Sequence, residues 1–174
     1  MEFDLNNTLQ ILERTPQVLK DLLSGLSDDW VLQNEGGDTW SPYDIVGHLI
    51  HGEHTNWMCR LEIIMQEGGN KTFIPFTRST QFTASEGKSL KQLLDEFESI
   101  RKRNLKKLKE LSLTGSDLSR TGIHPEFGEV TMAQLLSTWT VHDLTHLSQI
   151  IRVMAKQYKT SIGPWVNYIR LLSL

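Results

Sequence analysis

The chain has 174 residues, of which 39% are hydrophobic and 22% charged, so it has the composition of a folded globular protein and not of a disordered one. Its net charge of −3 disfavours a general nucleic-acid-binding function. This length favours one domain over residues 1–174, built on a single core.

No apolar run approaches the roughly 18 residues of a membrane span, so no membrane partner is expected. Residues 1–5 carry acids where a signal peptide needs basic residues, which predicts a cytoplasmic protein. The single cysteine, Cys59, rules out an internal disulfide and any multi-cysteine zinc site. We expect Cys59 to be a small buried apolar residue, and any metal to be bound by histidine and carboxylate.

The first predicted helix covers residues 4–24, where apolar residues recur at helical spacing. Proline lacks the backbone N–H of a helix interior, so Pro16 should either kink this helix or start a second piece capped by Thr15. The following residues to Thr39 include Gly36 and Gly37 and are expected to form a loop.

The second predicted helix begins at Ser41, which precedes a proline at the first turn and an acid at position 44. It should continue to about Gln66, where glycines follow. Its apolar residues occupy two faces, as in a helix that is buried on both sides. On one of them, Gly52 lies one turn from His48 and would allow another helix or a ligand to come close, which makes His48 a candidate metal ligand.

Residues 67–88 form a long connection without clear periodicity, which is typical of a functional loop or a crossover. The third predicted helix covers residues 89–111. Its basic cluster at 101–107 follows a run of acids, so it complements the helix dipole and allows a pair between Glu98 and Lys102. We therefore interpret the cluster as a solvated face and not as a nucleic-acid site.

Residues 114–130 are predicted to be an irregular connection, in which His124 precedes a proline and is not expected to be a ligand. The fourth helix should run from Thr131 to about Tyr158, and a short last helix should open at Gly163 and Pro164. Four main helices and hardly any strand-like alternation predict an all-α fold, namely a four-helix bundle that departs from simple up-down order.

The strongest chemical signal is the pair His142 and His146 in the fourth helix. Residues four apart lie on one face, and both histidines fill gaps in the apolar ladder of Met132, Leu135, Trp139, Ile150 and Val153. Two inward imidazoles without partners would cost about 1–3 kcal/mol per unsatisfied group, and a shared metal ion removes this cost. The alternative is two core histidines, each hydrogen-bonded to a carbonyl or hydroxyl. If a metal is bound, a third ligand must come from another segment.

Two stretches resemble the DinB superfamily, which includes YfiT-like metal-dependent hydrolases. They are WSPYDIVGHL at residues 40–49 and TWTVHDLTHLSQ at residues 138–149. The resemblance implies an up-down-down-up four-helix bundle, often dimeric, with a divalent metal such as zinc, nickel or manganese held by His48, His142 and His146. Since His51 and His54 follow His48, His51 stays open as a substitute or supporting ligand.

The resemblance also implies the chemistry, because characterised relatives include transferases that add a low-molecular-weight thiol to an electrophile. Three neutral imidazoles would leave a metal its double charge and an open position for a water or a thiol. Since Cys59 is the single thiol of the chain, the thiol would come from a small-molecule cofactor.

Four residues are candidates for supporting roles. Gln149 and Glu53 are the candidate catalytic residues: Gln149 shares a face with His146 and could bond a ligand, a water or substrate, and Glu53 could orient a ligand or act as a base. Glu53 could equally be a charge at the bundle edge. Trp57 and Trp139 are candidate pocket residues, which core packing would also explain.

Two functions are therefore expected. The first is a metal-dependent thiol S-transferase or hydrolase that acts on a small electrophile, as a homodimer. The second is a non-catalytic metal-binding or dimer-forming bundle, for instance a stress protein.

Overall fold

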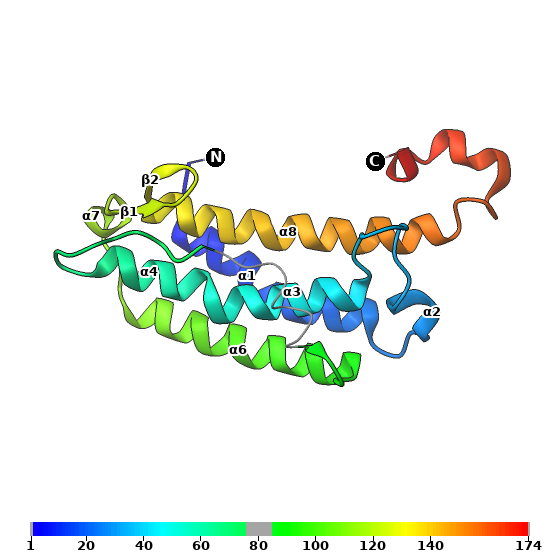
Figure 1. Cartoon of the computed structure of the whole chain (residues 1–174), viewed down its shortest axis with the longest axis horizontal. Helices are drawn as coiled ribbons and strands as arrows, with labels where there is room; N and C mark the ends of the chain where they lie inside the picture. The colour runs from blue at the N-terminus through cyan, green and yellow to red at the C-terminus, as the bar shows by residue number, and fades with distance from the viewer. Residues whose placement is uncertain (1, 76–84, 174) are drawn as a thin grey trace.

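The chain folds into a four-helix bundle, seen in a computed structural model that describes residues 2–75 and 85–173. Within these residues, α1 and α8 run in one direction and α3, α4 and α6 in the other, which confirms the up-down-down-up order (Figure 1). The long elements are α1 (Leu5–Leu23), α3 (Pro42–Thr55), α4 (Trp57–Met65), α6 (Leu90–Glu110) and α8 (Met132–Gln157).

The helix starts lie where the capping residues predict them. In α3, α6 and α8 a Ser or Thr side chain accepts a hydrogen bond from the backbone N–H three residues on, and that residue's side chain bonds back to the cap. The pairs are Ser41 with Asp44, Ser89 with Gln92, and Thr131 with Gln134.

The first helix is continuous through Pro16. Because Pro16 has no N–H, it cannot bond the carbonyl of Leu12 one turn earlier. The expected second helical piece at Thr15 is absent, since Thr15 instead donates its hydroxyl to the carbonyl of Ile11. A short helix, α2 (Asp28–Val31), lies in the predicted loop.

The second predicted helix is divided in two. Helix α3 ends at Thr55 and α4 begins at Trp57, because Asn56 has a ψ of −72°, away from the regular helical value. The backbone N–H of Asn56 bonds the carbonyl of Gly52, and the N–H of Arg60 bonds the carbonyl of Asn56. These helical hydrogen bonds continue across the break, so the two helices remain nearly in line (Figure 1).

The connection predicted to be irregular contains regular structure. After α7 (Gly115–Leu118), strands β1 (Thr121–His124) and β2 (Gly128–Thr131) form an antiparallel hairpin. The two strands have only four residues each, so their sequence pattern was too weak to predict the hairpin. The backbone N–H of Phe73 donates to the carbonyl of Ile123, so the segment around Phe73, which follows α4, lies along β1.

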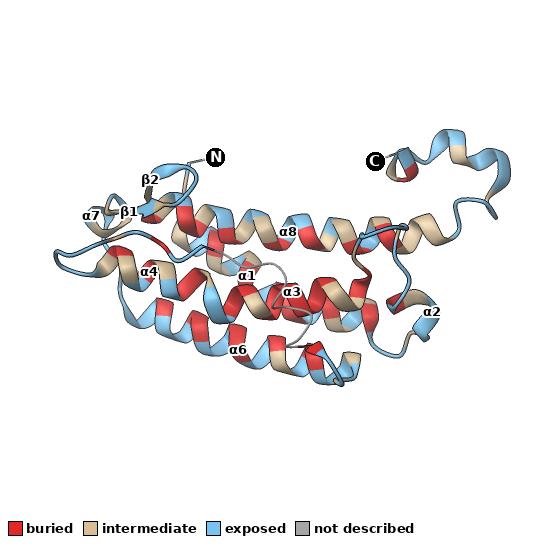
Figure 2. Cartoon of the chain, in the orientation of Figure 1, coloured by how far each residue is buried: buried red, intermediate tan, exposed pale blue. Residues whose placement is uncertain are grey.

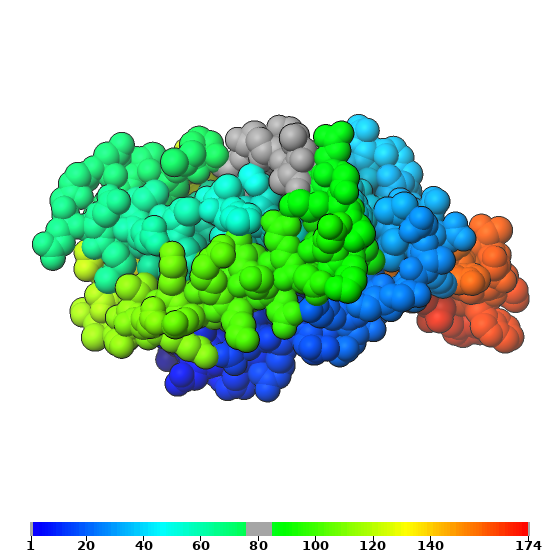
Figure 3. All heavy atoms as spheres, turned by 90° about the horizontal axis from the view of Figure 1, so that it is seen from below, coloured from blue at the N-terminus to red at the C-terminus, as the bar shows by residue number. Residues whose placement is uncertain are grey.

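The carboxyl-terminal part forms turns of 3-10 helix, η1 (Gly163–Tyr168) and η2 (Arg170–Ser173), where a short helix was predicted. This part lies at one end of the bundle (Figures 1 and 3). Within the described residues, no helix is long and apolar enough to cross a membrane.

The interior consists of two apolar clusters in the described part of the chain, separated by polar residues. One cluster includes Leu12, Leu61 and Trp139, and the other includes Leu19, Ile50 and Phe97. Figure 2 shows the buried residues on the facing sides of the long helices. The buried polar residues between the clusters are Glu53, Arg101, Asn104 and Asp143.

Three predictions about polar positions were wrong. Cys59 is exposed, because it lies on the outer side of α4. Arg101 is buried and does not belong to the solvated basic face, because two carboxylates compensate its charge. Glu98 accepts a hydrogen bond from Lys20 of α1 in place of the predicted pair with Lys102.

Candidate metal centre

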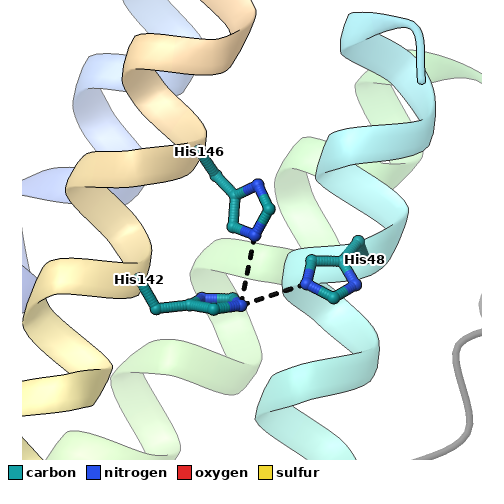
Figure 4. A group of neighbouring side chains, drawn as sticks. All are labelled: His48, His142 and His146. Carbon is teal, nitrogen blue, oxygen red and sulfur yellow. Dashed lines mark hydrogen bonds between the residues drawn. The ribbon is translucent and has the colours of Figure 1, made fainter. Parts of the chain in front are cut away.

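Three histidines from two helices meet at one point. His142 and His146 project from successive turns of α8, and His48 projects from α3 toward them (Figure 4). His142 Nε2 lies 3.0 Å from His48 Nε2 and 3.2 Å from His146 Nε2. Among the histidines, cysteines and acids of the described residues, these three side chains have ligand atoms that converge closely enough to hold a metal ion.

The histidines are largely removed from water, and this lowers the pKa of the two on α8. His48 and His146 are buried, and His142 is half-buried. Burial, with a further contribution from His146 and His48, lowers the pKa of His142 from 6.5 to about 2. Burial also lowers the pKa of His146. At neutral pH the imidazoles of His142 and His146 therefore keep the lone pairs that a metal requires.

Gln149 fixes the tautomer of His146. Its Oε1 lies 2.8 Å from His146 Nδ1, so Nδ1 carries the hydrogen and donates it. The lone pair of His146 is therefore on Nε2, which faces His142. A hydrogen bond from the second ring nitrogen commonly orients a metal-binding histidine.

The donor set fits a metal ion. His142 Nε2 lies between two nitrogens and has at most one hydrogen, so it can satisfy one of them at best. His142 Nδ1 is buried and has no hydrogen-bond partner among the described residues. Tetrahedral nitrogen ligands about 2.0 Å from a zinc ion stand about 3.3 Å apart, close to the two distances from His142 Nε2 to the other rings. A cation at the centre would remove the repulsion between the lone pairs.

The centre opens into a cavity of about 700 Å³. Trp40 and Trp57 line it together with the three histidines, and the ring centroid of Trp57 lies 5.0 Å from that of His142. Trp139 does not line the cavity but stacks behind Trp57, with centroids 5.7 Å apart. The cavity is in the size range of small-molecule sites.

Glu53 lies between the apolar clusters and not at the bundle edge. It is 3% exposed, forms an ion pair with Arg101, and accepts hydrogen bonds from Trp139 Nε1 at 2.9 Å and from Asn104. Burial raises its pKa, although Arg101 opposes the shift. Glu53 does not line the cavity, so its contacts are those of a positioning residue that supports Trp139.

Sequence reasoning did not find the buried charges around Glu53. Arg101 Nη1 and Nη2 contact both oxygens of Asp143, and Asn104 bonds Glu53. A signal was present: Arg101 follows Phe97 by four residues and precedes Leu105 by four, at a position where an apolar residue belongs.

The other histidines do not join the centre. His51 and His124 are not among the converging ligand atoms, and His124 lies on β1, stacked on Phe127. His54 is exposed and lies 3.7 Å from Glu96. Among the described residues, the structure thus brings together His48, His142 and His146, the set that the resemblance implies.

The fold and site define a class, a helical bundle with a three-histidine group facing a cavity. Residues 11–150 match the DinB superfamily, and the chain belongs to it. It is 24% identical over 147 residues to a protein of Oceanobacillus iheyensis named "Putative metal-dependent hydrolase OB0782", covering 84% of this chain and 83% of that protein.

A solved structure shares the fold. YfiT from Bacillus subtilis, described as a "probable metal-dependent hydrolase with an unusual four-helix bundle topology", matches with a TM-score of 0.72 at 17% identity. The match covers 91% of this chain and 87% of that one, so the similarity extends over nearly the whole bundle.

Proposed function

We propose that this protein is a divalent-metal-dependent enzyme, a thiol S-transferase or hydrolase that acts on a small electrophilic molecule. The convergence of three imidazoles at the wall of a cavity carries the proposal. A non-catalytic metal site is usually closed by four protein ligands, whereas a site that faces a cavity leaves room for a reactant.

Each candidate residue has a role in this proposal. His48, His142 and His146 hold the ion, which would be zinc, nickel or manganese, and Gln149 orients His146. Trp57 forms a wall of the reactant site, and Trp139 and Glu53 keep Trp57 in place from behind.

The nucleophile is activated at the three histidines and not by a carboxylate. When bound, a divalent ion supplies Lewis acidity, which lowers the pKa of a water or thiol that reaches it. We assign Glu53 a supporting role and not that of the general base, because it does not line the cavity and its oxygens accept hydrogen bonds from Arg101, Asn104 and Trp139. The lone Cys59 lies on the outer surface, so a reacting thiol would be a small molecule.

Elemental analysis of gently purified protein tests the metal. We expect about one divalent ion per chain in the wild type and far less in His146→Ala. His54→Ala is the matched control, because His54 is exposed and outside the centre.

Two assays of the loaded protein test the reaction. With a small thiol and 1-chloro-2,4-dinitrobenzene, a transferase forms the carbon–sulfur bond, breaks the carbon–chlorine bond and releases chloride and a proton. With a nitrophenyl ester and no thiol, a hydrolase releases nitrophenol and the acid. Rates equal in wild type and His146→Ala would overturn the proposal.

We also propose that two copies of this single-domain protein pair through the outer face of α8, in the cytoplasm. Val141, Leu144 and Ile151 lie on this face at helical spacing and are 46–59% exposed. Light scattering on the wild type and Leu144→Glu tests this pairing, with a monomeric wild type as the contradictory result.

A further inference from the structure

A positively charged side chain lies in the same cavity as the three histidines. Arg60 is half-buried on α4 and lines the cavity with His142 and Trp57. Trp57 contacts the ring of His142, and Arg60 follows Trp57 by three residues, so it lies about 5 Å further along the helix. A small molecule at the histidines could therefore reach Arg60.

Arg60 differs from the other shielded arginines that the structure describes. Arg101, Arg120 and Arg152 are buried or half-buried, and each has a carboxylate within 4.0 Å. No described carboxylate lies that close to Arg60, and residues 76–84 contain no acid in their sequence. Arg60 thus lacks the compensation that its counterparts have.

The guanidinium is held in place by an aromatic ring. Its central carbon lies 5.2 Å from the centroid of Phe73, which is 1% exposed. Phe73 in turn packs against Gly122 of β1, where an added Cβ would lie 2.5 Å from the ring. The wall that carries Arg60 therefore has a defined position before any ligand binds.

The electrostatics favour an anion at Arg60, which is half-buried, although the exposed acid Glu126 also lines the cavity. Burial lowers the pKa of Arg60, which reflects an unfavourable loss of hydration. Burial lowers the pKa of His124 in the cavity wall, the charge of Arg60 lowers it further, and Glu126 opposes the shift. An anion that binds Arg60 would stabilise its charge in place of the water that burial removes.

We propose that Arg60 binds the carboxylate of the substrate, while the reactive group of the substrate lies at the three histidines. This inference rests on the proposed function, because it takes the cavity as the substrate site. Arginine matches a carboxylate through two parallel N–H···O bonds. Arg60 is the one Lys or Arg among the described lining residues, which suits a singly charged group better than a phosphate dianion.

Binding to metal-free protein tests this proposal without catalysis. The probes are 3-phenylpropionate and its uncharged amide, and the readout is quenching of tryptophan fluorescence, since Trp40 and Trp57 line the cavity. We expect the wild type to bind the acid at least tenfold more tightly than the amide. Arg60→Gln should reduce this ratio to near one, and Arg60→Lys should keep part of it.

The matched control is Arg103→Gln, because Arg103 is exposed on α6 and should leave the ratio unchanged. A wild-type ratio near one, no quenching by either probe, or an unchanged ratio in Arg60→Gln would overturn the inference. A preference that appears only after metal is added would also overturn it, because the carboxylate would then bind the ion. Because this test needs no metal, its failure is distinguishable from a failure of the proposed enzyme activity.

Discussion

Arg101 Nη1 donates a hydrogen bond of 3.0 Å to the carbonyl oxygen of Leu12, the carbonyl that Pro16 leaves without its helical partner. Through this bond and its contacts with Glu53 and Asp143, Arg101 joins α6 to α1, α3 and α8. Burial acts to lower the pKa of Arg101, but Asp143 and Glu53 together raise it, so the guanidinium stays charged. One side chain thus connects α1, α3, α6 and α8 beside the candidate metal centre.

Replacing Arg101 should destabilise the protein strongly. In Arg101→Met, the carboxylates of Glu53 and Asp143 remain buried without a cation, and we expect the free energy of unfolding to fall by about 3–5 kcal/mol. Urea denaturation measures the loss. Arg103→Met is the control, and Arg101→Met within about 0.5 kcal/mol of wild type would contradict the role of Arg101.

Removing the side chain of Gln149 should weaken metal binding. Without its oxygen, His146 Nδ1 loses the bond that keeps the lone pair on Nε2, so we expect affinity to fall about 10–100-fold in Gln149→Ala. Competition with a chelating dye gives the affinity. The control is Ser148→Ala at the exposed neighbouring position, which should bind metal as the wild type does. If Gln149→Ala and Ser148→Ala bind the metal with equal affinity, Gln149 does not orient His146.

Acid should destabilise the metal-free protein below pH 6.5. The folded pKa of His142 is about 2 and its ordinary value is 6.5, so between these values the unfolded chain binds the extra proton. Stability therefore falls as pH falls through this window, by about 1 kcal/mol from His142 at pH 5.5. Urea unfolding at pH 7.5 and 5.5 measures this change. His142→Gln should reduce it, and identical pH profiles would count against a buried neutral His142.

A methyl group at position 122 should disturb the cavity wall. In Gly122→Ala the added carbon would lie 2.5 Å from Phe73 and 3.0 Å from Ile64, so we expect a loss of about 1–3 kcal/mol. Thermal unfolding measures the loss. The control is Gly115→Ala, where a Cβ meets nothing within 4 Å. If Gly122→Ala and Gly115→Ala are equally stable, Phe73 can move aside without a loss of stability, which would contradict the expectation of a rigid cavity wall.

The local signals of the sequence were sufficient for the helices and for two of the three histidines of the centre. Ser41, Ser89 and Thr131 mark helix starts because their side chains bond backbone N–H groups only three residues away. His142 and His146 share a face because a helix repeats every 3.6 residues. The third histidine was harder, since His48, His51 and His54 lie in one helix and its rotation in the bundle selects among them.

The sequence by itself determined the helical class, the paired histidines of α8 and, by resemblance, the family. Only the tertiary structure decided that Arg101 is buried, that Glu53 is held away from the cavity, and that Arg60 faces it. The physical reason is range. Caps and helical faces arise from contacts a few residues apart, whereas burial of a charge depends on partners that lie 42 and 48 residues away, as Asp143 and Glu53 do for Arg101.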